Sequence, residues 1–195
     1  MNKVRGLTLV ELVVTLAIAA ILLTLAAPSF TRLVQSTKIS GNVNTFMSDL
    51  RFARSEAVRR GGAVTMCRSS NPETTSASGP TCGTGSLVGW ESGWIIFLDQ
   101  DNDGTRDFNA NLSLDDTILR VQGPITNIDS ISEGGAATAF RFTASGRLLN
   151  LSSATQIQFG GGDYANTVQR VVCINLGGRA RIAGDSTTSC GTGGL

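Results

Sequence analysis

The chain has 195 residues, with 16 Lys and Arg against 15 Asp and Glu, so its formal net charge is +1. A near-neutral total argues against a protein coated in positive charge, although local patches remain open. The sequence contains no histidine, which excludes Ser-His-Asp, Cys-His and histidine-zinc chemistry. No other nucleophile–base pair is recognisable, so we predict neither an enzyme nor a cofactor.

The N-terminus indicates a membrane protein. Residues 1–6 (MNKVRG) are short and basic, and residues 7–30 are almost wholly apolar, which is long enough for a membrane helix of about 20 residues. A secretory signal is the competing interpretation. Glu11 disfavours it, because a carboxylate near the bilayer centre costs about 2.5–3.5 kcal/mol. Cleavage after Gly6 would place an α-amine on Leu7, one helical turn from Glu11, where the two charges can neutralise each other.

The heptapeptide GLTLVEL at residues 6–12, followed by an apolar helix, resembles the class III leader of type IV pilins and type II secretion pseudopilins. Leu7 departs from the Phe or Met usual after the cut. The resemblance implies that prepilin peptidase cleaves and N-methylates at Gly6 and Leu7, and that Glu11 acts in assembly. It also implies a single-pass protein of the bacterial inner membrane, with a periplasmic domain. After assembly it would join other pilin subunits in a pilus at the cell surface.

The helix is predicted to continue to about Arg60, where Gly61 and Gly62 end it. Apolar residues recur there at alternating spacings of four and three, as on one face of a helix: Ile39, Val43, Phe46, Leu50, Ala53 and Ala57. A coiled-coil seam is the alternative, weakened by a length under three heptads. We therefore expect residues 31–61 to be an amphipathic continuation that packs on a globular domain, residues 62–195.

The remainder is strand-like, with dense β-formers such as WIIF at 94–97 and VVCI at 171–174. We predict strands at 63–67, 93–98, 117–122, 138–143, 155–159, 168–175 and 179–183, a turn at 144–146, and loops at 69–89 and 185–195. The fold class is α+β, with a long N-terminal helix packed on an antiparallel β-sheet domain.

Four cysteines, Cys67, Cys82, Cys173 and Cys190, show no CxxC spacing, which argues against zinc and thioredoxin motifs. Disulfides fit an exported chain, and three connectivities are possible in principle. Pairing of sequence neighbours, Cys67–Cys82 and Cys173–Cys190, would staple the Ser-rich loop and the C-terminal tail. Free buried thiols are the alternative.

An acidic stretch places Asp99, Asp101 and Asp103 at alternate positions ahead of Gly104. This matches the first half of an EF-hand loop and makes a weak calcium candidate. Ala110 stands where the closing Glu would be, and a predicted strand precedes the loop instead of a helix. The alternative is an acidic β-turn held by Asx hydrogen bonds. No other metal site is predicted.

Three further segments narrow the resemblance to one branch of the family. They are ARSEA at 53–57, the tryptophan-led strand and acidic turn at 89–104, and FTASG at 142–146. Together they resemble the GspH/FimT branch of minor pilins and pseudopilins, which implies a type IV pilin-like fold.

The last motif is GRAR at 178–181. Arg179 and Arg181 would share one face of a strand and could clamp a phosphate beside the flexible Gly178; two merely solvent-facing arginines are the alternative. GRAR also resembles the GRxR signature of FimT proteins in natural transformation, which implies DNA as a partner. Arg170 is a further candidate for DNA binding. Charge is unevenly distributed along the chain. The part after residue 139 contains five arginines and two aspartates, whereas residues 91–133 contain nine acidic residues and two arginines.

DNA binding of this kind would be backbone-directed, tolerant of sequence and sensitive to salt. The main alternative is a structural role without DNA binding, as a tip-priming minor pilin or a type II secretion pseudopilin. In that role the GRAR arginines would face a partner subunit.

Overall fold

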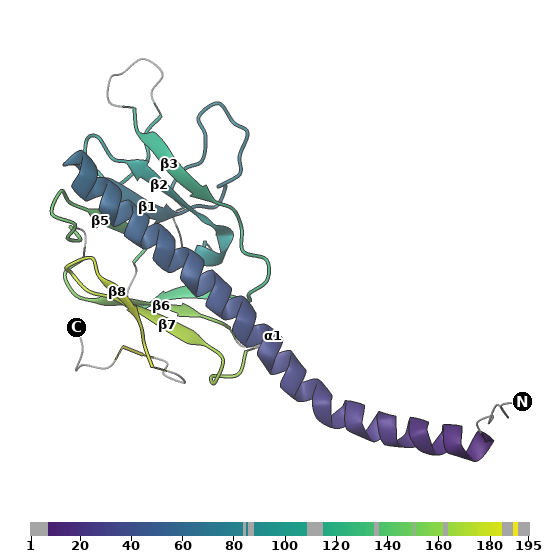
Figure 1. Ribbon diagram of the computed structural model, residues 1–195. Helices are drawn as coiled ribbons and strands as arrows, with labels where there is room; N and C mark the ends of the chain where they lie inside the picture. The colour runs from purple at the N-terminus through teal and green to yellow at the C-terminus, as the bar shows by residue number, and fades with distance from the viewer. Residues whose placement is uncertain are drawn as a thin grey trace, which may run out of the picture. The chain divides into compact units, whose positions relative to one another are not determined.

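The computed structural model describes residues 8–83, 85, 88–108, 115–134, 137–149, 151–161, 164–184 and 189–190. The chain divides into two compact units, Met1–Thr37 and Lys38–Leu195. One long helix, α1 (Leu9–Arg60), belongs partly to each unit (Figure 1).

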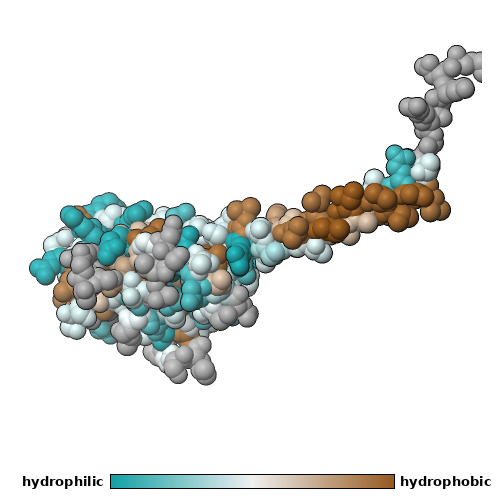
Figure 2. All heavy atoms as spheres, turned by 90° about the horizontal axis from the view of Figure 1, so that it is seen from below, coloured by the Kyte–Doolittle hydropathy of each residue, from teal (hydrophilic) through white to brown (hydrophobic). Residues whose placement is uncertain are grey.

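The N-terminal unit is the apolar part of α1. Its large aliphatic side chains are exposed, among them Leu16 at 62% and Leu25 at 70%. Figure 2 shows an almost unbroken apolar surface over this part of the helix. By its length and composition, this segment can cross a membrane.

The C-terminal part of α1 packs on the β-structure as the sequence predicts. All six residues of the predicted apolar stripe, Ile39 to Ala57, are at most 1% exposed. The helix ends at Arg60, where Gly61 adopts a φ of 66° and the Gly62 N–H donates to the Ala57 carbonyl at 3.3 Å. These are features of a Schellman C-cap, which the glycine at position 61 makes possible.

The first antiparallel sheet has the strand order β3-β2-β1-β5. Its strands are β1 (Val64–Arg68), β2 (Trp94–Leu98), β3 (Thr117–Gln122) and β5 (Ala139–Phe142). A short 3-10 helix, η1 (Trp90–Ser92), precedes β2. We call this the first sheet.

The second antiparallel sheet has the order β4-β6-β7-β8. Its strands are β4 (Ile131–Gly134), β6 (Thr155–Phe159), β7 (Arg170–Ile174) and β8 (Ala180–Ile182). All seven predicted strands are present, with ends shifted by at most two residues. The sequence did not predict β4, η1 or the division into two sheets.

One aromatic cluster joins the helix to both sheets. Phe46 of α1 makes edge-to-face contacts with four rings at centroid distances of 5.3–6.2 Å: Trp90, Trp94, Phe140 and Phe159. Trp94 and Phe140 belong to the first sheet and Phe159 to the second. The core therefore lies where the inner faces of both sheets meet the helix.

Each disulfide covers the outer face of one sheet, and the cysteines pair as expected. Cys67–Cys82 holds the Ser-rich loop over the first sheet, next to the buried Ile95 and Phe97. Cys173–Cys190 ties Cys190 to the outer face of the second sheet, next to the buried Val171 and Ala183.

Candidate functional site

The GRAR motif lies in the hairpin between β7 and β8. The Gly178 N–H donates to the Asn175 carbonyl at 2.9 Å, and the Asn175 N–H donates to the Arg179 carbonyl at 3.0 Å. Gly178 has a φ of 72°. These features are those of a type I turn followed by a left-handed residue, a common three-residue hairpin loop in which glycine is favoured. The Arg179 N–H also donates to Asn175 Oδ1 at 3.0 Å. Backbone and side-chain hydrogen bonds between Asn175 and Arg179 therefore close the loop.

Arg179 and Arg181 are both exposed. Arg181 lies directly across from Cys173 in the ladder, so the two side chains share the outer face of the second sheet. The backbone pairing continues to Arg179 opposite Asn175, which places Arg179 on the same face, two residues away. The structure thus brings together the two predicted arginines.

Arg170 lies on the other face of the second sheet. It stands across from Phe159, a core residue, and alternates with Val171, whose side chain is on the outer face. Its guanidinium Nη1 donates to the carbonyls of Thr167 and Gln169 at 3.4 and 3.1 Å. Arg170 therefore does not join Arg179 and Arg181.

Gly178 is buried against a second turn. A Cβ atom at this position would stand 2.3 Å from the Gly146 carbonyl oxygen and 3.0 Å from the Phe142 ring. Such an approach is too close for any side chain. Glycine at position 178 is therefore required both by the left-handed backbone and by the packing of the two turns.

The second turn is itself fixed to the helix. Arg54 of α1 donates from Nε to the Gly146 carbonyl at 3.0 Å, and the Leu148 N–H donates to the Leu176 carbonyl at 3.0 Å. Three motifs noted separately in the sequence, ARSEA, FTASG and GRAR, thus meet at one place. Sequence reasoning identified each motif but gave no sign that they are in contact.

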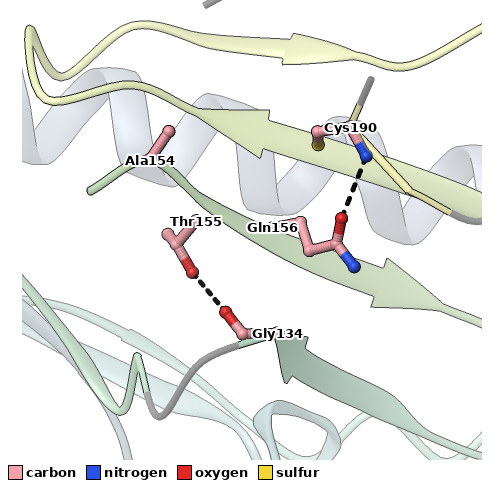
Figure 3. A pocket seen from close by; sticks show the side chains of 5 residues that line it. All are labelled: Gly134, Ala154, Thr155, Gln156 and Cys190. Atoms are coloured by element: carbon pink, nitrogen blue, oxygen red, sulfur yellow. Dashed lines mark hydrogen bonds between the residues drawn. The ribbon is translucent and has the colours of Figure 1, made fainter. Parts of the chain in front are cut away.

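The outer face of the second sheet also carries a hollow (Figure 3). It has a volume of about 250 Å³ and is lined by Gly134, Ala154, Thr155, Gln156 and Cys190. Its polar groups bond to one another: the Thr155 hydroxyl donates to the Gly134 carbonyl at 2.7 Å, and the Cys190 N–H donates to Gln156 Oε1 at 3.0 Å. Gln156 stands one strand beyond Cys173, itself across from Arg181, so the hollow shares the arginines' face.

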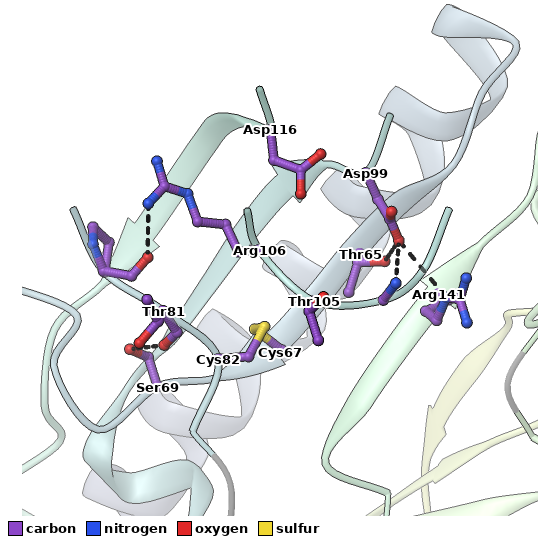
Figure 4. The surroundings of a disulfide bond; sticks show 12 residues. Thr65, Cys67, Ser69, Thr81, Cys82, Asp99, Thr105, Arg106, Asp116 and Arg141 are labelled. Atoms are coloured by element: carbon purple, nitrogen blue, oxygen red, sulfur yellow. Dashed lines mark hydrogen bonds and ion pairs between the residues drawn. A yellow bond between two sulfur atoms is a disulfide. The ribbon is translucent and has the colours of Figure 1, made fainter. Parts of the chain in front are cut away.

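The acidic loop follows β2, and Figure 4 shows its first carboxylate, that of Asp99, pointing toward Thr65 and Arg141. Carboxylate oxygens of Asp99, Asp101 and Asp103 lie within 4.8 Å of one another. Asp99 Oδ2 accepts hydrogen bonds from the Thr65 hydroxyl at 2.8 Å and from the Gly104 N–H at 3.1 Å. Burial raises the pKa of the Asp99 carboxyl, opposed by that Thr65 bond and by the charge of Arg141.

Arg141 supplies a positive charge to this loop. Its Nε lies 3.7 Å from Asp99 Oδ2, and its Nη2 donates to the Asn102 carbonyl. The Arg141 stem also packs against Gly104. A protein cation therefore partly compensates the carboxylates, and the calcium site stays a prediction; Ala110, at the position of the closing ligand, lies outside the described residues.

The structure describes only part of the predicted processing site. Gly6 and Leu7 lie outside the described residues. Glu11 is exposed in the first turn of α1, and its N–H donates to the Thr8 hydroxyl at 3.2 Å, the bond of a helix N-cap.

A long N-terminal helix followed by antiparallel sheets is the fold of type IV pilins. The family model described as "Type II transport protein GspH" matches residues 42–178, and the prokaryotic N-terminal methylation motif matches residues 1–27. The chain belongs to the GspH family. The match ends at Gly178, so Arg179 and Arg181 lie just beyond it.

Solved structures agree with this fold. Two crystal forms of the Pseudomonas aeruginosa type IV minor pilin FimU are similar to the chain. One has a TM-score of 0.52 at 18% identity, covering 77% of this chain and 92% of FimU. The other has a TM-score of 0.50 at 20% identity, covering 76% and 94%. No curated protein matches the chain.

The chain is therefore a pilin-like or pseudopilin-like protein of the GspH family, with an N-terminal methylation motif and a helix that is long and apolar enough to cross a membrane. Members of this family are structural proteins, and membership implies processing by prepilin peptidase and association with other pilus subunits.

Proposed function

We propose that this protein is a minor pilin that binds extracellular DNA, without sequence preference, for uptake in natural transformation. The observation that carries the proposal is the placement of Arg179 and Arg181. Both are exposed, on one face, beside a loop held by backbone hydrogen bonds. A guanidinium presents a planar fork of donors that suits phosphate oxygens.

The charge distribution supports this proposal. The acidic cluster of Asp99, Asp101 and Asp103 follows β2 of the first sheet, whereas Arg179 and Arg181 belong to the second sheet. Because exposed charges are screened over about 10 Å at 0.1 M salt, a local basic surface can attract DNA despite a near-neutral chain. Affinity should then fall steeply with salt.

The processing steps complete the proposal. Prepilin peptidase cleaves after Gly6 and methylates the new amine of Leu7, and Glu11 acts in assembly. The chain resides in the inner membrane with its β-domain in the periplasm and then enters a pilus. The methylation-motif match over residues 1–27 supports this step.

The test is DNA binding by the full chain in neutral detergent, measured by fluorescence anisotropy with a labelled duplex over a series of salt concentrations. Arg179→Gln with Arg181→Gln should weaken binding at low salt at least about tenfold. It should also lower the slope of log K against log salt by about 1.8, since each lost phosphate contact removes about 0.9. Lys38→Gln is the control for removal of an exposed charge on the helix.

A second pair of variants separates charge from geometry. Arg179→Lys with Arg181→Lys keeps the charge and loses the fork, so the slope should be kept while affinity falls. Unchanged affinity in the glutamine variant contradicts the proposal. Absence of binding by the wild-type chain at low salt favours the structural alternative, in which these arginines contact a partner pilin; the likeness in fold to a minor pilin supports that alternative.

A further inference from the structure

Five arginines follow residue 139, and the structure separates them into four groups. Arg141 contacts the acidic loop, and Arg170 lies on the inner face of the second sheet. Arg179 and Arg181 form the proposed DNA site. Arg147 is left, in the turn after β5, and it is exposed.

We infer that Arg147 is a third DNA-phosphate contact, and that the two turns at 143–147 and 175–179 form one anion-binding edge. The inference rests on the proposed function and extends it to a residue outside the GRAR motif. In Figure 1 both turns lie at the end of the β-domain where α1 terminates.

The contact between the two turns places Arg147 beside Arg179. Each arginine immediately follows one of the two glycines in contact, Gly146 and Gly178. From that contact, with consecutive Cα atoms about 3.8 Å apart, the Cα atoms of Arg147 and Arg179 are at most roughly 10 Å apart. Arginine side chains are long enough to reach neighbouring phosphates of one strand from such positions.

The backbone of Arg147 is fixed while its side chain is available. Its N–H donates to the Thr143 hydroxyl at 3.3 Å and its carbonyl accepts from the Thr143 N–H at 2.9 Å. Within the described ranges, its guanidinium makes no ion pair or hydrogen bond. The neighbouring Arg54 bond to Gly146 adds a further cation at the base of the same turn.

The absence of nearby acid in the described part of these turns strengthens the inference. The turn at 143–147 has the sequence TASGR and the turn at 175–179 has NLGGR. Each contains one arginine and no carboxylate, so neither turn itself places a negative charge beside an approaching phosphate.

The experiment uses the full chain in neutral detergent and the same labelled duplex. Arg147→Gln should lower the salt slope by about 0.9 and weaken binding several-fold at low salt. Its thermal unfolding should match wild type, because the side chain is exposed and the turn is held by backbone atoms. The matched control is Lys38→Gln, which removes the same charge from α1 about 24 Å along the helix from Arg54.

The outcomes separate this inference from the proposed function. If Arg147→Gln and Lys38→Gln bind alike while the Arg179→Gln/Arg181→Gln variant loses binding, the third contact is wrong and the proposed function stands. If the wild-type chain does not bind DNA, both are overturned. A slope reduction seen with Arg147→Gln and not with Lys38→Gln supports the inference.

Discussion

Two glycines, Gly146 and Gly178, determine how closely the turns beside the candidate site approach. Both have a positive φ, 75° and 72°, and both are buried. The Gly146 carbonyl oxygen lies close to Gly178 and also accepts the Arg54 hydrogen bond. The close contact of the two turns, and with it the positions of Arg147 and Arg179, thus depends on glycine at both preceding residues.

Gly178→Ala should destabilise the protein. The left-handed backbone alone costs a non-glycine residue about 1–2 kcal/mol, and the new Cβ would be 2.3 Å from the Gly146 oxygen. We therefore expect a loss of at least about 1 kcal/mol in the free energy of unfolding, measured by urea denaturation.

Gly177→Ala is the matched control. Its φ lies outside the left-handed region, and a Cβ there would meet only the flexible Asn175 side chain. Equal stability of the two alanine variants would contradict the role assigned to Gly178.

At the scale of the elements, six of the seven strands predicted from the sequence are rich in β-branched and aromatic residues, and the seventh, at 179–183, contains only Ile182. The missed strand, β4, has the sequence ISEG, which combines one strong β-former with a charge and a glycine. It exists because β6 offers it a partner along four residues. Such non-local pairing leaves no periodic signal in a short segment.

The division into two sheets could not be predicted for the same reason. A composition rich in β-formers identifies a segment as a strand, but it does not say which strands are neighbours. In the first sheet β1 lies between β2 and β5, an order set by contacts between segments more than 70 residues apart in sequence. That Arg179 and Arg181 share one face could be predicted, because side chains alternate along a strand and these two are two residues apart. The position of Arg170 on the opposite face of the sheet depends on the register between β7 and β6.

The C-terminal disulfide should stabilise the second sheet. Cys173 and Cys190 are separated by 17 residues, and closing a loop of about 15 residues is worth about 3 kcal/mol. Cys173→Ala with Cys190→Ala should therefore lower the free energy of unfolding by about 2–4 kcal/mol, measured by urea denaturation.

The Cys67→Ala/Cys82→Ala variant provides the comparison, because its loop is of similar length, 15 residues. A similar loss is expected there. If removing the C-terminal disulfide leaves stability unchanged, then the link between Cys190 and β7 contributes nothing to the stability of the folded state.

On the scale of the whole molecule, the boundary of the compact β-containing unit falls within α1, between Thr37 and Lys38. From the sequence we predict that the apolar stripe Ile39–Ala57 packs on a globular domain of residues 62–195. The compact unit in the structure includes this part of the helix. The structure shows that the helix supplies the centre of the core, since Phe46 contacts aromatic rings from both sheets.

A fragment of residues 38–195 should therefore fold, and a fragment of residues 62–195 should not. The shorter fragment loses six side chains that are at most 1% exposed. Removal of one buried Phe costs about 3–5 kcal/mol, against a total stability of about 5–15 kcal/mol for a domain.

Near-ultraviolet circular dichroism of the two tryptophans, followed during thermal unfolding, distinguishes these cases. The longer fragment should show a cooperative loss of signal, and the shorter one should show none. Cooperative unfolding of residues 62–195 would mean that the sheets form a core without the helix.

The contact between Gly178 and Gly146 also affects how the GRxR signature should be used as a diagnostic. The first letter of the motif reports on how two turns fit together, so glycine at that position is expected in any member that shares this architecture, whatever it binds. Only the arginines carry information about a ligand. A sequence search that weights the glycine will find proteins that share this packing of turns. A search that weights the two arginines will find proteins that share the proposed phosphate contacts.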